Sequence, residues 1–312
     1  MSGHIVVVGS LNMDLVVRTQ RLPIPGETII GSDFRTFPGG KGANQAVAAA
    51  RLGGAVKMIG RVGGDDFGRA LLKAVAQDGV DTSQILTDPE AASGVALITV
   101  EAGGQNTIVV ASGANSHLTT QDVSAAEASF EGASVLLLQL ESPLAAVVRA
   151  IELARKYQAQ VVLNPAPAQL LEVDFLSRVD YLVPNQSELA LLTGMETISD
   201  ALQALRAQGL RRGARVPTVI VTLGGEGVLV VKDSQELRLP AYSVQVIDTT
   251  AAGDAFVGAF AVALTEGLPL EIAAAWGNAA GALTVTRAGA QPSLPTRAEF
   301  KQFLPEGSIE AD

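Results

Sequence analysis

Cysteine is absent from all 312 residues of the sequence. A disulfide framework and a thiolate metal site are therefore excluded. Basic residues are also scarce, since 22 Lys and Arg stand against 32 Asp and Glu, for a formal net charge of −10. No cluster of Lys and Arg occurs. Because binding to phosphate backbones needs concentrated positive charge, we expect neither nucleic acid nor an anionic membrane as a partner.

Long apolar runs and aromatic residues are scarce as well. No uncharged apolar run reaches 18 residues, and the N-terminal "MSGHIVVVGS" has no basic region before a long apolar segment. We therefore expect a soluble, cytoplasmic protein. Aromatic residues make up 4% of the chain and hydrophobic residues 48%, so the core must consist mainly of Ala, Val, Leu and Ile. Such a core suits parallel strands covered by helices.

Short β-branched runs alternate with segments whose apolar spacing fits helices. This alternation predicts β-α-β units, and hence an α/β fold with a doubly wound, mostly parallel sheet flanked by helices. The predicted strands are 4–10, 56–62, 134–142, 159–167, 179–185 and 218–225, and the predicted helices are 41–53, 65–79, 143–157 and 199–209.

Two regions break this alternation. Residues 15–37 and 93–111 read as strand pairs joined by Pro and Gly turns, with no helix between the strands. We expect them to form a small antiparallel sheet outside the main one. A lid over a binding site is favoured over a purely structural hairpin. The chain is thus predicted to be one α/β domain, 1–312, with this lid inserted.

Ligands of open α/β sheets bind beyond the carboxyl ends of the strands, so the residues that follow each apolar run are candidates. Asn12 and Asp14 follow the first run and alternate along an extended chain, so both side chains can point the same way. They suit vicinal hydroxyls of a sugar, but a turn stabilised by Asx hydrogen bonds is an equal alternative.

A glycine-rich turn opens the first predicted helix. Gly39, Gly40 and Gly42 surround Lys41, and Asn44 follows. Glycines allow a ligand to approach backbone amides, and a helix N-terminus favours an anion. A simple turn into a helix would not need three glycines, a lysine and an asparagine, so a ligand site is favoured over such a turn. The segment matches neither GxxxxGK[ST] nor GxGxxG.

Three further strand ends carry ambiguous signals. Glu141 accepts hydrogen bonds from a polar ligand or caps the helix near Pro143. Asn185 and Glu188 have the spacing of a capping box, which is the preferred interpretation of this pair alone. The segment 222–227, with Thr222, Gly224, Gly225 and Gly227, suits a nucleotide lying across the backbone and suits a hairpin equally.

The strongest motif is "DTTAAGDAFVGAF", residues 248–260, at the start of an alanine-rich helix. Ala251 to Asp254 are predicted to form a first turn whose free N–H groups make an anion hole for a transferring phosphoryl group. Asp254 is then placed to accept a proton from an attacking hydroxyl. The helix end should keep it ionised. The alternative is a carboxylate that merely stabilises the first turn.

Together these segments resemble the ribokinase branch of the PfkB carbohydrate kinase family. The matching segments occur in the family's order across nearly the whole chain: "GSLNMD", "PGET", "PGGKGANQAVAA", "LQLESP", "LNPAPA", "PNQSE", "TLGGEGV", "DTTAAGDAFVGA" and "RAGAQPS". One match alone is weak, but nine in order are specific.

The resemblance implies transfer of a phosphoryl group from ATP to the 5-hydroxyl of D-ribose. Asp254 would be the base, and the backbone of Ala251, Ala252 and Gly253 the anion hole. The implied sugar residues are Asn12, Asp14, Gly40, Lys41, Asn44 and Glu141. The implied nucleotide residues are Asn185, Thr222, Gly224, Gly227 and Asn278.

The resemblance also implies ions and a partner. Glu188 would organise Mg²⁺ through water, and a K⁺ site would lie beside the anion hole. A homodimer through the lids is expected. The residues that match the K⁺ site, several of them through backbone carbonyls, are Asp248, Thr250, Thr284, Arg287, Gly289 and Ser293.

Two positions depart from the family pattern. Many members have Gly where this chain has Ala251, and the Ala form is typical of ribokinases within the family. Some relatives have a larger polar residue where this chain has Gly225, a difference that bears on adenine recognition. The alternatives are a sibling kinase acting on 2-deoxyribose, another sugar or a nucleoside, and a noncatalytic sugar-binding protein. A nicotinamide dehydrogenase is poorly supported.

Overall fold

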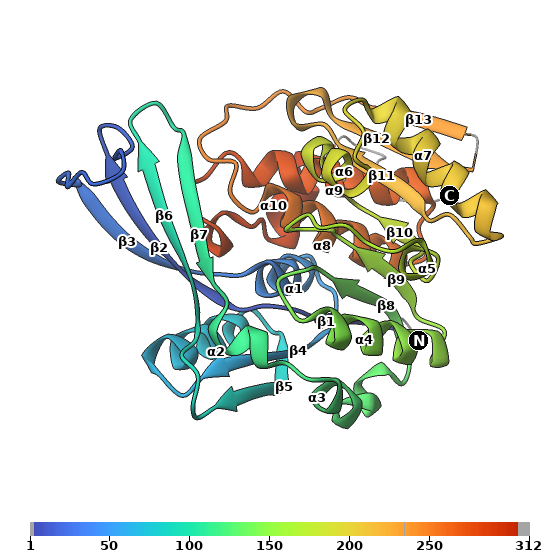
Figure 1. The fold of residues 1–312 in the computed structure, drawn as a ribbon, viewed down its shortest axis with the longest axis horizontal. Helices are drawn as coiled ribbons and strands as arrows, with labels where there is room; N and C mark the ends of the chain where they lie inside the picture. The colour runs from blue at the N-terminus through green and yellow to red at the C-terminus, as the bar shows by residue number, and fades with distance from the viewer. Residues whose placement is uncertain (1–2, 234, 305–312) are drawn as a thin grey trace.

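The computed structural model describes residues 3–233 and 235–304, so both ends of the predicted domain 1–312 lie outside the described residues. Two separate sheets organise the chain (Figure 1). The main sheet has nine strands in the order β13-β12-β11-β10-β9-β8-β1-β4-β5. These strands are β1 (His4–Val8), β4 (Val56–Gly63), β5 (Asp81–Asp88), β8 (Ala133–Leu138), β9 (Gln160–Leu163), β10 (Tyr181–Leu182), β11 (Thr218–Thr222), β12 (Val228–Lys232) and β13 (Gln235–Leu239).

The main sheet is parallel from β5 to β11, and β12 and β13 add antiparallel strands at one edge. Ten α-helices are described, and they cover both faces. The predicted doubly wound, mostly parallel sheet is confirmed. The helices are α1 (Lys41–Arg51), α2 (Asp66–Gln77), α3 (Thr120–Ala125), α4 (Leu144–Lys156), α5 (Val173–Leu176), α6 (Gln186–Thr193), α7 (Ile198–Arg212), α8 (Ala252–Thr265), α9 (Leu270–Thr284) and α10 (Arg297–Phe303).

Two hydrophobic cores lie on the two faces of the main sheet. Along β1, Ile5 and Val7 enter the core with α1, α8 and α9, whereas Val6 and Val8 enter the core with α4. This alternation follows from the two-residue period of a strand. It explains why the strands read as continuous apolar runs, since both faces are buried.

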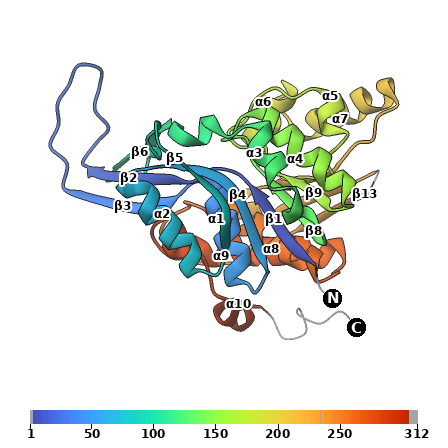
Figure 2. The same cartoon turned by 90° about the horizontal axis from the view of Figure 1, so that it is seen from below.

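The small sheet stands apart from the main one, at the left in Figure 1. It contains β2 (Asn12–Thr19), β3 (Asp33–Gly39), β6 (Gly94–Glu101) and β7 (Asn106–Ala111), in the order β3-β2-β6-β7. The predicted separate sheet is confirmed, but the expectation of a purely antiparallel sheet is wrong. Strands β2 and β6 pair in parallel, because both leave the main sheet in the same direction. Figure 2 shows the loop between β2 and β3 projecting beyond the sheet.

Helices α1 and α8 lie side by side (Figure 1). A Cβ atom added at Gly258 in α8 would lie 2.6 Å from the Cβ of Ala48 in α1, so glycine permits this close approach. The N-termini of both helices consequently lie near each other at the carboxyl ends of the strands. No helix in the described part of the chain is long and apolar enough to cross a membrane.

Candidate active site

Three pockets adjoin one another beyond the carboxyl ends of the central strands. The inner pocket, about 870 Å³, lies under the small sheet and is lined by residues such as Asp14, Glu141 and Asp254. The outer pocket, about 430 Å³, lies beside α9 and the turn after β11. A bridging pocket of about 180 Å³ shares Asp254 with the inner pocket and Gly253 with the outer one.

The turn before α8 separates the inner and outer pockets. Ala251 precedes the helix with φ 60°, a left-handed conformation, and no side chain caps the helix there. The backbone N–H groups of Gly253 and Asp254 have no hydrogen-bond partner among the described residues, which leaves two donors for an anion. The N–H of Ala252 is less available than predicted, because it donates to the Thr249 carbonyl at 3.3 Å.

Asp254 does not stabilise its own helix by capping. Its Oδ2 accepts a hydrogen bond from Asn44 Nδ2 at 2.9 Å, and its Oδ1 accepts one from Gln45 Nε2 at 3.0 Å, both from α1. The side chain is 6% exposed and lines the inner and bridging pockets. Burial raises the pKa of Asp254, whereas Lys41 and the two amides lower it and the net direction is upward. The carboxylate is therefore more basic than the helix end alone predicts.

Acidic side chains surround Lys41 at the floor of the inner pocket. Burial, Glu141 and Asp254 raise the pKa of Asp14 to about 7, and Lys41 opposes them. Burial lowers the pKa of Lys41, but the carboxylates of Asp254, Glu141, Glu188 and Asp14 together raise it above its usual value. Such a polar floor suits a ligand rich in hydroxyl groups.

Glu141 lies at the centre of a hydrogen-bond network and does not cap the following helix, whose N-cap is Pro143. Its Oε2 accepts from Ser10 Oγ at 2.5 Å, from Asn12 Nδ2 at 3.3 Å and from the Lys41 backbone N–H at 3.1 Å. Asn12 and Asp14 both lie in β2 and both line the pocket, as predicted from their spacing.

The glycines before α1 are required by close approach. Gly40 has φ 90°, and a Cβ there would lie 2.6 Å from the backbone nitrogen of Asn12. A Cβ at Gly39 would lie 2.4 Å from a carboxyl oxygen of Asp14. The glycine-rich turn thus allows β2 and the start of α1 to meet at the inner pocket.

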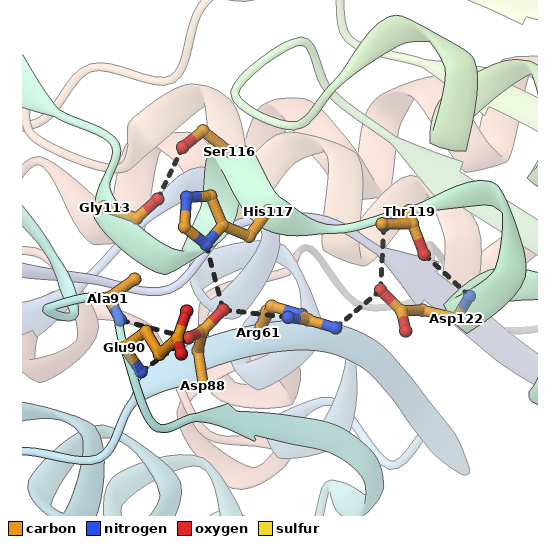
Figure 3. A network of polar contacts seen from close by, with 9 residues as sticks. All are labelled: Arg61, Asp88, Glu90, Ala91, Gly113, Ser116, His117, Thr119 and Asp122. Atoms are coloured by element: carbon orange, nitrogen blue, oxygen red, sulfur yellow. Dashed lines mark hydrogen bonds and ion pairs between the residues drawn. The ribbon is translucent and has the colours of Figure 1, made fainter.

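The short helix η1 (Gly113–His117) supports Asn12 from below the small sheet. Asn115 donates to the Asn12 side-chain oxygen at 2.8 Å and also bonds both backbone groups of Leu11. Figure 3 shows how the end of η1 is held: His117 and Arg61 both donate to Asp88. Hydrogen bonds from the Glu90 backbone, His117 and Arg61 hold the pKa of Asp88 well below its usual range.

The predicted nucleotide residues lie around the outer and bridging pockets. Thr222, Gly224, Gly225, Gly227 and Asn278 line the outer pocket, and Thr222 to Gly227 also form the β11–β12 hairpin. The hairpin interpretation of that segment is confirmed, and the nucleotide interpretation stays a prediction. Asn278 Nδ2 donates to the Pro240 carbonyl at 2.8 Å, and the largely apolar lining suits a flat aromatic base.

Asn185 and Glu188 form the predicted capping box at the start of α6. Each side chain bonds the other's backbone N–H at 2.8 Å. Both residues also line the bridging pocket, beside Lys41 and Asp254. Burial raises the pKa of Glu188, while the Asn185 N–H and Lys41 oppose the shift. The cap fixes Glu188 without using its second oxygen.

The residues predicted for a K⁺ site lie in the turn before α8 and in the segment from the end of α9 to the short helix η4 (Gln291–Ser293). Asp248 accepts hydrogen bonds from the Thr250 N–H at 2.9 Å and from the Gly289 N–H at 2.9 Å, and these outweigh burial to lower its pKa. The Thr284 hydroxyl donates to the Ala280 carbonyl within α9, and the Ser293 hydroxyl donates to the Ala290 carbonyl. Arg287 pairs with Glu299 at 2.6 Å. The Arg287 side chain is thus engaged elsewhere, so only its backbone could face a cation.

Several buried polar residues near the site were missed by sequence reasoning. Each of them interrupts an apolar segment, and each forms a hydrogen bond with a residue predicted for the site or with another member of the group. A buried polar side chain needs a hydrogen-bond partner, so a polar residue within an apolar segment was the signal that could have found them. They are Ser10, Gln45, Asn115, Gln139 and Asn164.

The chain belongs to the pfkB family of carbohydrate kinases, whose family model matches residues 2–297. Among its relatives is the ribokinase of Haemophilus influenzae, 44% identical over 97% of this chain and 99% of the relative. A deoxyribokinase of Salmonella typhi is 37% identical over 96% of this chain and 98% of its own length.

Solved structures agree with this assignment. A ribokinase of Arabidopsis thaliana, determined in complex with ribose and ATP, is 32% identical and superposes with a TM-score of 0.86. The alignment covers 97% of this chain and 99% of that one. The ribokinase-like α/β fold predicted from the sequence is thereby confirmed.

Proposed function

We propose that this protein is a ribokinase, which transfers the γ-phosphoryl group of ATP to the 5-hydroxyl of D-ribose. The observation that carries the proposal is the position of Asp254. It lies between a polar pocket under the small sheet and the open N-terminus of α8, with both carboxylate oxygens oriented by α1.

The reaction follows from this arrangement. Ribose in the inner pocket would present its 5-hydroxyl to Asp254, which accepts the proton as the oxygen attacks the γ-phosphorus. The bond from that phosphorus to the bridging oxygen of ADP breaks. The N–H groups of Gly253 and Asp254 would stabilise charge on the transferring group, and Lys41 offsets charge from the inner side.

The nucleotide would occupy the outer pocket, with its base near Asn278 and its phosphates over Gly224 and Gly227. Glu188 suits Mg²⁺, because this ion is commonly held by one or two carboxylates together with substrate phosphates and water. Bound Mg²⁺ would neutralise phosphate charge. Asp248 and the backbone carbonyls of residues 248–250 and 284–293 would provide the oxygen-only donors that suit K⁺. We therefore propose that ATP, Mg²⁺ and K⁺ all act in this enzyme.

The small sheet is proposed to be a lid that pairs with the lid of a second copy. On its face away from the inner pocket, Leu15, Leu97 and Val109 occupy opposed positions on neighbouring strands, and Val17 and Phe34 form the next row. Leu97 is 52% exposed, Val109 64% and Phe34 60%. A patch of this kind marks an interaction surface. A homodimer in the cytoplasm is the proposed working form.

A coupled assay of ADP release tests the function. Mg-ATP is supplied with ribose, 2-deoxyribose, fructose or adenosine, each in K⁺ and in Na⁺ buffer. We expect ribose to be preferred and K⁺ to increase turnover. Preference for 2-deoxyribose would show that the enzyme is a deoxyribokinase. Sugar binding without ADP release would indicate a noncatalytic protein.

A further inference from the structure

Gln45 lies behind Asp254 in a network of buried amide side chains. Its Nε2 donates to Asp254 Oδ1 at 3.0 Å and to Asn164 Oδ1 at 3.2 Å. Its Oε1 accepts from Gln139 Nε2 at 2.6 Å. Gln45 has no exposed surface. Both ends of its amide group are therefore engaged.

The network defines which way the Gln45 amide points. Asn164 Nδ2 donates to the Val183 carbonyl at 2.9 Å, so its oxygen is the group left for Gln45. A reversed Gln45 would direct its oxygen at two other oxygens and its NH₂ at the NH₂ of Gln139. Gln139, Asn164 and Val183 follow β8, β9 and β10, so the orientation is anchored to the centre of the main sheet.

Asn44 and Gln45 divide the two oxygens of Asp254 between them. Asn44 lines the inner pocket, where a substrate would contact it, but Gln45 lines none of the three pockets. A buried carboxylate is costly unless it is hydrogen-bonded. The charge of Lys41 gives the largest compensation, and the hydrogen bonds from Asn44 and Gln45 come next. The other charged groups near Asp254 are acidic and add none: Glu141, Asp14 and Glu188.

We propose that Gln45 is a positioning residue for Asp254, holding the carboxylate in the orientation that receives the substrate proton without touching either substrate. The inference rests on the proposed kinase function. Loss of the Gln45 donor also removes a hydrogen bond to the charged form of Asp254, which favours the protonated acid. The inference therefore predicts a change in the pH dependence of turnover, which a residue needed only for packing would not cause.

Two variants test the proposal. Gln45→Met keeps the length of the side chain but removes the N–H donor. We expect kcat to fall about 10- to 100-fold, the loss of one hydrogen bond to a charged group. The KM for ribose should change less than about threefold, because the inner pocket is intact. The acid limb of the kcat profile should move to higher pH.

Gln45→Glu keeps the shape of the side chain. Here the acid limb should also move to higher pH, because two adjoining buried carboxyl groups share one proton. Melting temperatures establish that each variant is folded. Folded variants with unchanged kcat and an unmoved acid limb would overturn the proposal and make Gln45 a packing residue.

A titration that needs no turnover completes the test. The carboxyl carbon of Asp254 is followed by NMR in protein labelled at aspartate, with Asp254→Asn identifying the signal. A higher pKa in Gln45→Met, or in Gln139→Met if the first variant does not fold, supports the proposal, and an equal pKa contradicts it. A wild-type protein that releases no ADP with ribose would refute the proposed function while this titration still decides the role of Gln45.

Discussion

Asn44 and Asp254 are 210 positions apart in the sequence, and Asn44 Nδ2 donates a hydrogen bond to Asp254 Oδ2 at 2.9 Å. This contact joins the first turns of α1 and α8, the two helices that begin at the strongest motifs of the sequence. Because α1 borders the inner pocket and α8 separates it from the outer one, the bond places a proton acceptor between two binding sites.

The protonation of Asp14 should make stability depend on pH. Its pKa is about 7 in the fold against 3.8 for the unperturbed group, so the folded protein binds an extra proton between these values. The contribution of Asp14 to the free energy of unfolding is therefore highest below pH 3.8, where Asp14 is protonated in both states, and it falls as the pH rises through about 7. Asp14→Asn should therefore raise the free energy of unfolding at pH 8 by up to about 4 kcal/mol.

Urea denaturation of both proteins at pH 4.5 and pH 8 measures this effect. The gain in the free energy of unfolding should be much smaller at pH 4.5 than at pH 8. Asp14→Asn should also lower the affinity for ribose. An equal difference at the two pH values would contradict the assignment of a raised pKa.

The left-handed conformation of Ala251 predicts a stabilising substitution. A residue with a Cβ atom is strained at φ 60°, and glycine is not. We expect Ala251→Gly to raise the free energy of unfolding by about 0.5 to 1 kcal/mol. Ala252→Gly, one residue further into the helix, is the matched control and should give no gain. Thermal unfolding decides between these outcomes, and equal effects of the two changes would argue against strain at Ala251.

Glu188→Gln separates the capping role of this residue from its proposed role with Mg²⁺. Glutamine retains an oxygen that can accept from the Asn185 N–H, so the melting temperature should stay within about 2 °C of the wild type. The Mg²⁺ concentration needed for half-maximal turnover should rise at least about threefold, because a carboxylate is lost. Unchanged Mg²⁺ dependence would restrict Glu188 to the cap.

The exposed face of the small sheet predicts the oligomeric state. Leu97→Glu introduces a charge into the apolar patch and should convert a dimer into a monomer at micromolar concentration. Leu191, which is 62% exposed on α6, provides the control, since Leu191→Glu should leave the dimer intact. Analytical ultracentrifugation measures both. A monomeric wild type, or a dimeric Leu97→Glu, would contradict pairing through the lids.

The alternation of apolar runs and helical segments was sufficient to predict the main sheet, because strands such as β1 are buried on both faces. The pairing of β2 with β6 was not, since it joins segments about 80 residues apart and leaves no local pattern. The Asp254 turn was recognisable from its small residues. The contribution of Gln45 was not, because its partners lie on three separate elements.

The most direct test of the central claim is the turnover of Asp254→Asn with ribose and Mg-ATP in K⁺ buffer. If Asp254 is the general base, kcat should fall by about two to four powers of ten. The variant should remain folded, because the substitution removes a buried charge. Turnover within a few-fold of the wild type, with a loss of about 1 kcal/mol in stability, would show that Asp254 serves only the first turn of its helix.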